Sequence, residues 1–352
     1  MTNLHRYEEL LSNKKHYLYR LEHNTFVVKS INLLYMDTPK TAGTSLKTRL
    51  AETEANYTPP EDSASLETVS EMFIHDRAIN PLKPVTAYPR DQQQEMLFSE
   101  QWKRVCVVRN PYERLFSAWF SKILLRQPGF MARVSGYHLP RSIGSRKDIY
   151  RYFEEFVNHL NTFGCDSDPH WDLQTRLLFH DTIEWSKILR FETLQEELLG
   201  NKEYFGGNEI VLDRLNVSGF SPDWDLVSSE TKKMIQSIYR DDFSEYNYSL
   251  DPPGVPTDFD TLVTYVNSVA SRNDRLGVLF ELNRQAEQEI GLQRREQEAL
   301  RVENEALRFA NQAAIDRLTV AESELDSLVS SRSWRVTRPL RAMMDFLRSI
   351  RH

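Results

Sequence analysis

Three short apolar runs separated by helical patterns constrain most strongly how this chain can fold. The runs are Ile31–Met36, Arg104–Val108 and Lys187–Phe191. Each is short enough for a buried strand, and each is followed by residues typical of a helix start. Strands that alternate with helices form parallel sheets covered on both faces. The sequence therefore predicts an α/β domain in which a central parallel sheet lies between two layers of helices.

The pattern changes at Asp251–Asp260, a segment dense in proline and acid that predicts a linker over 251–260. A long helix is expected over 261–330, with a heptad repeat from Ile290. Asn at a positions favours a two-stranded parallel coiled coil, so we expect a homodimer; a solvated helix packed on its own domain is the alternative. The a positions are Ile290, Gln297, Asn304, Asn311, Leu318 and Leu325, and the d positions are Gln293, Leu300, Leu307, Ala314, Ala321 and Leu328.

The remaining segments are an N-terminal segment over 1–30, the main domain over 31–250 and a basic tail over 331–352. From Arg332 to His352 the tail holds six Arg and one acid, with Trp, Leu, Phe and Ile between them. A basic amphipathic pattern of this kind is typical of a peripheral contact with a membrane surface or an anionic partner. A frayed basic tail is the alternative.

Charge and hydropathy exclude several classes of protein. The net charge of −7 argues against a nucleic-acid-binding protein. Neither a signal-peptide pattern nor an apolar run of about 18 residues is present, so we expect a cytoplasmic protein, at most peripheral to the inner membrane face. The stretch from Lys103 to Arg151 is locally basic, with eleven Lys or Arg against two acids. This local excess of positive charge suggests an anionic ligand.

A loop rich in hydroxyl groups follows the first apolar run and opens a helix. The backbone N–H groups of a helix N-terminus form an anion site, to which Lys40 adds a positive charge, and Gly43 would let a phosphate approach the backbone. Lys precedes Gly here, unlike the GxxxxGK[ST] pattern of kinases, which argues against ATP and a loop-bound Mg²⁺. The candidate residues are Pro39, Lys40, Thr41, Ala42, Gly43, Thr44 and Ser45.

A second candidate anion site follows the second apolar run. Arg109 stands at the carboxyl end of that predicted strand, where ligands of open α/β sheets bind. Asn110 can cap the next helix, Pro111 suits its first turn, and Glu113 completes a capping-box-like spacing. Ser117 lies two turns into that helix. The Arg109 fork and the Ser117 hydroxyl together can bind a second phosphate.

These two segments, PKTAGTS from Pro39 and VRNPYERLFSAWF from Val108, resemble the two signatures with which carbohydrate sulfotransferases bind PAPS (3′-phosphoadenosine-5′-phosphosulfate). The likeness is to the group that contains the chondroitin, dermatan and heparan 2-O enzymes, and it spans about Leu33 to Leu250. Further matches occur in the same order: Asp168-Pro169-His170-Trp171 with Gln174, Ile188–Leu194, and Ile238–Phe243 with Tyr246 and Tyr248.

The resemblance implies a P-loop-like three-layer fold and sulfuryl transfer from PAPS to a carbohydrate hydroxyl, with no metal. It also implies that Lys40 and the loop amides hold the 5′-phosphosulfate, while Arg109 and Ser117 hold the 3′-phosphate. The chain lacks the N-terminal anchor of Golgi members, which indicates a bacterial-type member. The tail Ser333–Arg341 is similar to short C-terminal segments of bacterial cell-surface polysaccharide enzymes, which favours a polysaccharide or glycolipid acceptor.

Transfer to a hydroxyl needs a general base, and His is the commonest. His75 follows a short apolar run, in the stretch where related enzymes carry a catalytic His, and it is the favoured base. His170 is the second candidate, suited to acceptor contact or structure. Glu192 and Asp76 are carboxylate alternatives, and an anionic sugar could be held by Arg77, Arg141 or Arg146. Two other functions stay open: a nucleotide-dependent kinase, and an inactive sulfotransferase-like scaffold that acts through its coiled coil.

Overall fold

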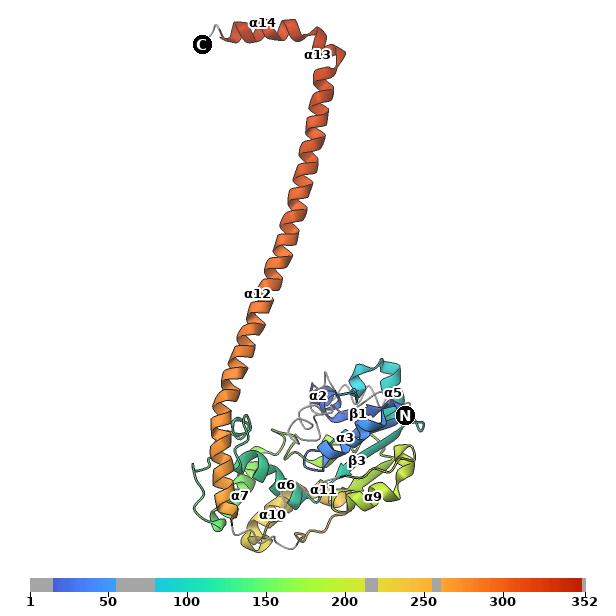
Figure 1. The fold of residues 1–352 in the computed structure, drawn as a ribbon, viewed down its shortest axis with the longest axis vertical. Coiled ribbons are helices and arrows are strands. Elements are labelled where there is room, and N and C mark those ends of the chain that lie inside the picture. The colour runs from blue at the N-terminus through green and yellow to red at the C-terminus, as the bar shows by residue number, and fades with distance from the viewer. Residues whose placement is uncertain (1–14, 55–79, 213–220, 255–260, 350–352) are drawn as a thin grey trace. The chain divides into compact units, whose positions relative to one another are not determined.

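The computed structural model describes residues 15–54, 80–212, 221–254 and 261–349 of the 352-residue chain (Figure 1). The chain divides into two compact units, of which the first ends at Val278 and the second comprises Leu279–His352. Across the described ranges, no helix is both long enough and apolar enough to cross a membrane.

The first unit is built on a four-stranded sheet with the order β1-β2-β3-β4. Strands β2 (Leu33–Met36), β3 (Lys103–Val108) and β4 (Lys187–Arg190) run parallel, as the three apolar runs predicted. Strand β1 (Thr25–Val28) pairs antiparallel with β2 at the edge. It lies within the predicted N-terminal segment 1–30, and its four residues carry no alternation or following helix signal that would have identified it.

Alternate side chains of the strands enter two separate cores, which confirms the three-layer α/β fold. On β3, Val105 and Val107 face one core, and Cys106 and Val108 face the other. The first core is closed by α3 (Gly43–Thr53) and α9 (Leu194–Gly200), and the second by α2 (Lys15–Asn24) and α5 (Arg90–Phe98). Each fully buried Leu or Val contributes about 1.5–3 kcal/mol to stability through removal from water.

A third core is formed mainly by helices and is rich in aromatic side chains. Trp119 and Phe153 are fully buried in it, with ring centroids 5.3 Å apart at an angle of 60°. Such edge-on pairs add stability beyond that of burial alone. The helices that supply this core are α6 (Pro111–Ala118), the π-helical turn Trp119–Leu124, α7 (Arg146–Phe163), α10 (Ser229–Ile238) and α11 (Arg240–Glu245).

Helix α12 (Leu262–Ser330) begins in the first unit, where Leu262 and Val266 are buried in the third core. The amide side chain of Asn267 exchanges two hydrogen bonds with the backbone of Ile143, at 2.7 and 2.8 Å. The first turns of α12 are therefore fixed to this third core. The second unit holds the rest of α12, then α13 (Arg332–Val336) and α14 (Arg338–Ser349). The predicted long C-terminal helix is thus present.

Short helices complete the described part of the chain. Helix α8 (Gln174–Leu177) follows the Asp168–Trp171 segment. The 3₁₀ helices are Lys29–Ile31, Val85–Ala87, Met131–Arg133, Phe191–Thr193, Lys202–Phe205 and Trp224–Leu226.

Candidate active site

The loop that joins β2 to α3 has an unusual backbone. Lys40 and Ala42 adopt φ angles of 74° and 62°, which are costly for residues with a Cβ atom. Such conformations persist where the surroundings fix them, and they concentrate at ligand sites. The Thr41 hydroxyl donates to the carbonyl of Thr38 at 2.7 Å and thereby holds the turn closed. The loop thus delivers the chain into the N-terminus of α3, as the sequence predicted.

Gly43, the first residue of α3, lies against a carboxylate. A Cβ atom on Gly43 would come within 1.8 Å of Oδ1 of Asp37. Asp37 is itself held by the buried Lys47 ammonium at 2.7 Å and by the Tyr35 hydroxyl, 3.3 Å from Oδ1. Burial raises the pKa of Tyr35 far above its ordinary value, and the Asp37 charge raises it further. The close approach of Asp37 is therefore enough by itself to require glycine at position 43.

The two sequence signatures meet at Arg109. Its Nη1 donates to the carbonyl of Lys40 at 3.2 Å, and its Nη2 donates to Glu113 at 3.1 Å. The guanidinium carbon lies 4.3 Å from the ring centroid of Phe191. Among the described residues, the buried Nε of Arg109 has no hydrogen-bond partner. The Nε–H of this guanidinium is thus a buried donor beside the loop whose hydrogen-bonding capacity is unused.

A pocket opens between the loop and α6. Lys40 and Arg109 line it together with Ser117, which brings a basic group of each signature and the predicted hydroxyl to one place. The Lys40 ammonium donates to the Ser121 hydroxyl at 2.9 Å. Ser121 belongs to the π-helical turn that continues α6, a departure from α-helix that is frequent at functional sites. The other lining residues are Glu113, Phe116, Phe120 and Pro222.

Buried charges of opposite sign face each other at this pocket. Burial lowers the pKa of Arg109, while the carboxylates of Glu113 and Glu192 act in the opposite direction. Burial raises the pKa of Glu113, against the effect of Arg109. Glu113 faces Arg109 instead of completing the capping box that its spacing from Asn110 predicted. Asn110 caps α6 through its own side chain, which accepts from Tyr112 N–H at 3.0 Å.

The backbone around Arg109 is held by polar side chains from distant segments. The Gln174 amide accepts from Arg109 N–H and donates to Arg109 C=O, both at 2.9 Å. The buried Asp242 in turn accepts from Gln174 N–H at 2.8 Å. Glu192 accepts from Asn110 N–H at 2.7 Å and from the Tyr248 hydroxyl at 3.0 Å. Both Glu192 oxygens are thus occupied in positioning the second signature.

Arg114 ties the loop to the Asp168–Trp171 segment. Its side chain is buried and donates to three carbonyl oxygens, those of Pro39 at 3.1 Å, Asp172 at 2.7 Å and Pro169 at 2.8 Å. A guanidinium suits this task because its donors form a rigid planar fork. Arg114 thereby fixes the position of the loop relative to His170.

His170 is oriented by a buried carboxylate. Its Nδ1 lies 2.6 Å from Oδ1 of Asp168, which also pairs with Arg133. Burial lowers the pKa of His170 to about 4; the Asp168 contact opposes this shift, and the positive charges of Lys122 and Lys40 increase it. A neutral imidazole whose Nδ1–H donates to Asp168 keeps Nε2 as a proton acceptor. The tautomer follows from the hydrogen bond.

The remaining predicted residues fall in different places. His75, Asp76 and Arg77 lie outside the described residues. Arg146 is within 3.6 Å of Asp223, and Arg141 lines a separate hollow near Ile143. Within the described ranges, no group of three or more His, Cys, Asp and Glu side chains could hold a metal ion.

Sequence reasoning gave no role to Ser121 or Arg114, and it named His170 as a candidate base without its contact to Asp168. A second serine one turn after Ser117 was a usable signal for Ser121. Burial of Arg114 depends on contacts with segments far along the chain, and no local pattern predicts it.

Comparison with known proteins agrees with this geometry. The family model described as "Sulfotransferase family" matches residues 23–249, which is more than half of the chain and includes both signatures and the Asp168–Trp171 segment. The chain therefore belongs to the sulfotransferase family. No curated protein gives a significant match to it. No solved structure does so either.

Proposed function

We propose that this chain transfers a sulfuryl group from PAPS to a hydroxyl of a carbohydrate acceptor, such as a polysaccharide or glycolipid. The observation that carries the proposal is the meeting of Lys40, Arg109 and Ser117 at one pocket, beside a buried Arg109 N–H without a partner. A donor with two separated phosphate groups needs two such anion sites. Family membership supports sulfuryl transfer, and PAPS is the donor typical of that family.

The residues divide between the two ends of the donor. The loop amides at the start of α3, with Lys40, would hold the 5′-phosphosulfate. The Arg109 fork and the Ser117 hydroxyl would hold the 3′-phosphate, as charge-assisted bonds favour. In the transfer, the acceptor oxygen forms a bond to sulfur while the bond from sulfur to the bridging oxygen breaks. Lys40 stabilises the negative charge that develops on that leaving oxygen.

The acceptor proton needs a base, and the Asp168–His170 pair is the best-supported base among the described residues. His170 is neutral at physiological pH, and its Asp168 contact leaves Nε2 as the acceptor. The Lys40 charge is among those that lower the His170 pKa, which supports a position near the proposed reacting end of the donor. Glu192 suits a positioning role better, since both its oxygens already accept hydrogen bonds. His75 remains the alternative base.

The surroundings of His170 support a sugar acceptor that carries negative charge. The Phe130 ring stands edge-on to His170, with ring centroids 5.0 Å apart. Cationic groups of Lys122 and Arg133 each lie 4.7 Å from the Phe130 centroid. The positive charges of Lys122 and Arg133 beside His170 can attract the carboxylate or sulfate groups of an acidic sugar.

The test is calorimetric titration of the full chain with PAP, the desulfated donor, and with ATP plus Mg²⁺. We expect PAP to bind and Arg109→Ala to weaken that binding about 100-fold, in proportion to a lost charge-assisted bidentate contact. Arg151→Ala, which removes an exposed Arg on α7, is the matched control and should leave PAP binding unchanged.

Three other results of these experiments would count against the proposed function. Binding of ATP with Mg²⁺ in preference to PAP would favour the kinase alternative. Binding of PAP without sulfuryl transfer from PAPS to any of a panel of glycans would favour the inactive scaffold. A folded chain that does not bind PAP at all would refute the proposed donor.

A further inference from the structure

The second unit exposes a regular row of apolar side chains along α12. Leu300, Leu307, Leu318, Leu325 and Leu328 are each 52–64% exposed in the single chain. They all occupy a or d positions of the heptad that begins at Ile290. An apolar row at a and d positions is the contact surface of coiled coils. We infer that this row pairs with the same row of a second copy of this chain, parallel and in register.

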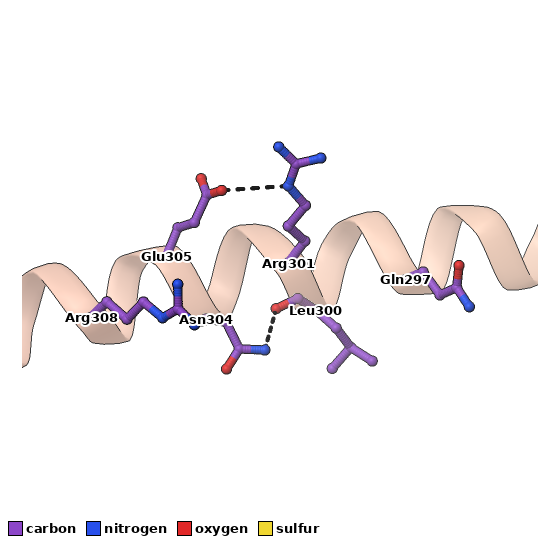
Figure 2. A pocket seen from close by; sticks show the side chains of 6 residues that line it. All are labelled: Gln297, Leu300, Arg301, Asn304, Glu305 and Arg308. Atoms are coloured by element: carbon purple, nitrogen blue, oxygen red, sulfur yellow. Dashed lines mark hydrogen bonds and ion pairs between the residues drawn. The ribbon is translucent and has the colours of Figure 1, made fainter.

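A hollow on this surface has the composition of a coiled-coil hole. Figure 2 shows it on one face of α12, lined by Gln297, Leu300, Arg301 and Asn304, with Glu305 and Arg308 beside them. The first four are at a, d, e and the next a position. In a parallel pair, four residues of one helix form the hole that receives an a or d side chain of its partner. Leu300 of the second copy, at the same height, fits this hole.

Charged residues at the e and g positions beside the apolar row can pair with those of a second copy of the chain. In a parallel pair, a g residue of one helix faces the e residue five positions later on the other helix, and opposite charges there select the partner. Four such pairs in this chain carry opposite charges. They are Glu289 with Arg294, Glu296 with Arg301, Glu303 with Arg308, and Arg317 with Glu322. The pattern is complementary to itself because every pair joins opposite charges. The g residue is acidic in the first three pairs and basic in the last.

The same residues fix the register. Asn304 and Asn311 occupy successive a positions, where each meets its own counterpart only when the two helices are aligned. A slip of one heptad leaves only two of the four opposed charge pairs in place. Within a single chain, Arg301 pairs instead with Glu305 at 3.4 Å, a contact exposed to water and worth little. Exchange of that contact for an interhelical one is therefore inexpensive.

Cysteine crosslinking of the full chain tests the alignment. Leu300→Cys should form a disulfide-linked dimer under mild oxidation, because the two d positions face each other. Val302→Cys, at an outward f position two residues away, is the matched control and should stay monomeric on a non-reducing gel. The native Cys106 and Cys165 are buried and should not interfere. Equal crosslinking of the two variants, or none by either, would overturn the parallel in-register pair.

Charge reversal tests the partner. Arg301→Glu with Arg308→Glu puts like charges against Glu296 and Glu303, and should weaken self-association roughly tenfold or more. The reverse variant, Glu296→Arg with Glu303→Arg, should behave alike, and a mixture of the two variants should recover the dimer by light scattering. A mixture that stays as weakly associated as its components contradicts the proposed charge pairing.

A separate observation concerns α14, also in the second unit. At 100° per residue, its apolar side chains gather on one half of the helix and its charged side chains on the other. The apolar half is exposed and consists of Leu340, Met343, Met344, Phe346 and Leu347. The Arg341 guanidinium stacks on the exposed Trp334 ring, 3.5 Å from its centroid.

The positive charge of α13 and α14 indicates what binds the exposed apolar face of α14. The charged residues from α13 to the end of α14 are Arg332, Arg335, Arg338, Arg341, Arg348 and the single acid Asp345. Arg side chains that flank an exposed apolar face fit the boundary between anionic lipid headgroups and acyl chains. We propose that α14 lies in the surface of an anionic membrane, which would hold a cytoplasmic enzyme at the inner face.

Co-sedimentation of the full chain with lipid vesicles tests this surface. We expect binding to vesicles of phosphatidylcholine with phosphatidylglycerol, and at least tenfold weaker binding to phosphatidylcholine alone. Leu340→Asp with Leu347→Asp should abolish binding. Ala342→Asp with Ser349→Asp adds the same charge on the polar half and should retain part of it. Equal loss in both double variants, or no binding by the unaltered chain, would refute an inserted apolar face.

Discussion

Arg114 Nε lies 3.1 Å from the carbonyl oxygen of Pro39, so a buried guanidinium on the second signature holds the start of the first. The same side chain reaches Asp172 and Pro169. Three segments that are remote in the sequence therefore depend on one Arg, and the relative position of the donor loop and His170 depends on it as well.

Replacement of Arg114 should strongly reduce the stability of the fold. Arg114→Met retains much of the volume but leaves three carbonyl oxygens without their donor, and we expect a loss of about 3–5 kcal/mol in the free energy of unfolding. Urea titration followed by fluorescence measures it. The exposed Arg151→Ala should change stability by no more than about 0.5 kcal/mol. Similar urea midpoints for the two variants would show that the Arg114 hydrogen bonds do not stabilise the fold.

Lys40 should matter for turnover far more than for folding. Lys40→Ala removes the charge proposed to stabilise the leaving oxygen, and should lower kcat about 10²–10³-fold while the melting temperature stays within a few degrees. Lys187→Ala, at the amino end of β4, is the control for loss of a Lys. Near-normal kcat in Lys40→Ala would remove the loop lysine from the mechanism.

The pKa of His170 leads to a prediction about acid. Because its folded pKa is about 4 and its ordinary value is 6.5, the unfolded chain binds the proton first as pH falls. The His170 contribution to stability is therefore full above about pH 6.5 and is lost between pH 6.5 and 4. His170→Gln should reduce the slope of stability against pH in that window, as measured by denaturant midpoints at successive pH values.

Activity separates the two candidate bases. If His170 is the base, the acid limb of kcat/KM falls well below pH 6.5, and His170→Gln lowers the rate about 10²–10⁴-fold. Only a small effect of His170→Gln, with a large loss of rate in His75→Gln, would favour His75 instead.

Gly43 should tolerate no side chain. Gly43→Ala places a methyl group within 1.8 Å of Asp37 Oδ1, and the resulting shift should cost about 1–3 kcal/mol of stability. Gly200 is a suitable control because a Cβ there meets nothing within 4 Å. Equal thermal stability of Gly43→Ala and Gly200→Ala would contradict the close packing of Asp37.

The sequence predicted the parts of the fold that depend on local pattern. The three parallel strands, the helix capped by Asn110 and the long C-terminal helix each have a periodicity or cap that can be read in one segment. Strand β1 was not identified because four residues beside a helix carry too weak a pattern.

The candidate site could be predicted where a signature places a residue at a strand end, as with Lys40 and Arg109. Other parts arise from contacts between remote segments. The Gln174 bridge to Arg109 and the Arg114 bonds join residues that are 55 to 75 positions apart. The Asp168–His170 contact is local, but the lowered pKa of His170 depends on burial that the fold creates. No single-segment pattern carries that information, so only the three-dimensional structure reveals these contacts.

The ion pair between Arg109 and Glu113 has a consequence for donor affinity. A phosphate that takes the Arg109 fork removes the cation that opposes the raised pKa of the buried Glu113, and adds negative charge nearby. Glu113 should then take up a proton as the ligand binds, so the measured heat will depend on the ionisation enthalpy of the buffer. By linkage, acidification through the pKa range of Glu113 strengthens donor binding. The pocket would thus respond to the proton concentration around it as well as to its ligand.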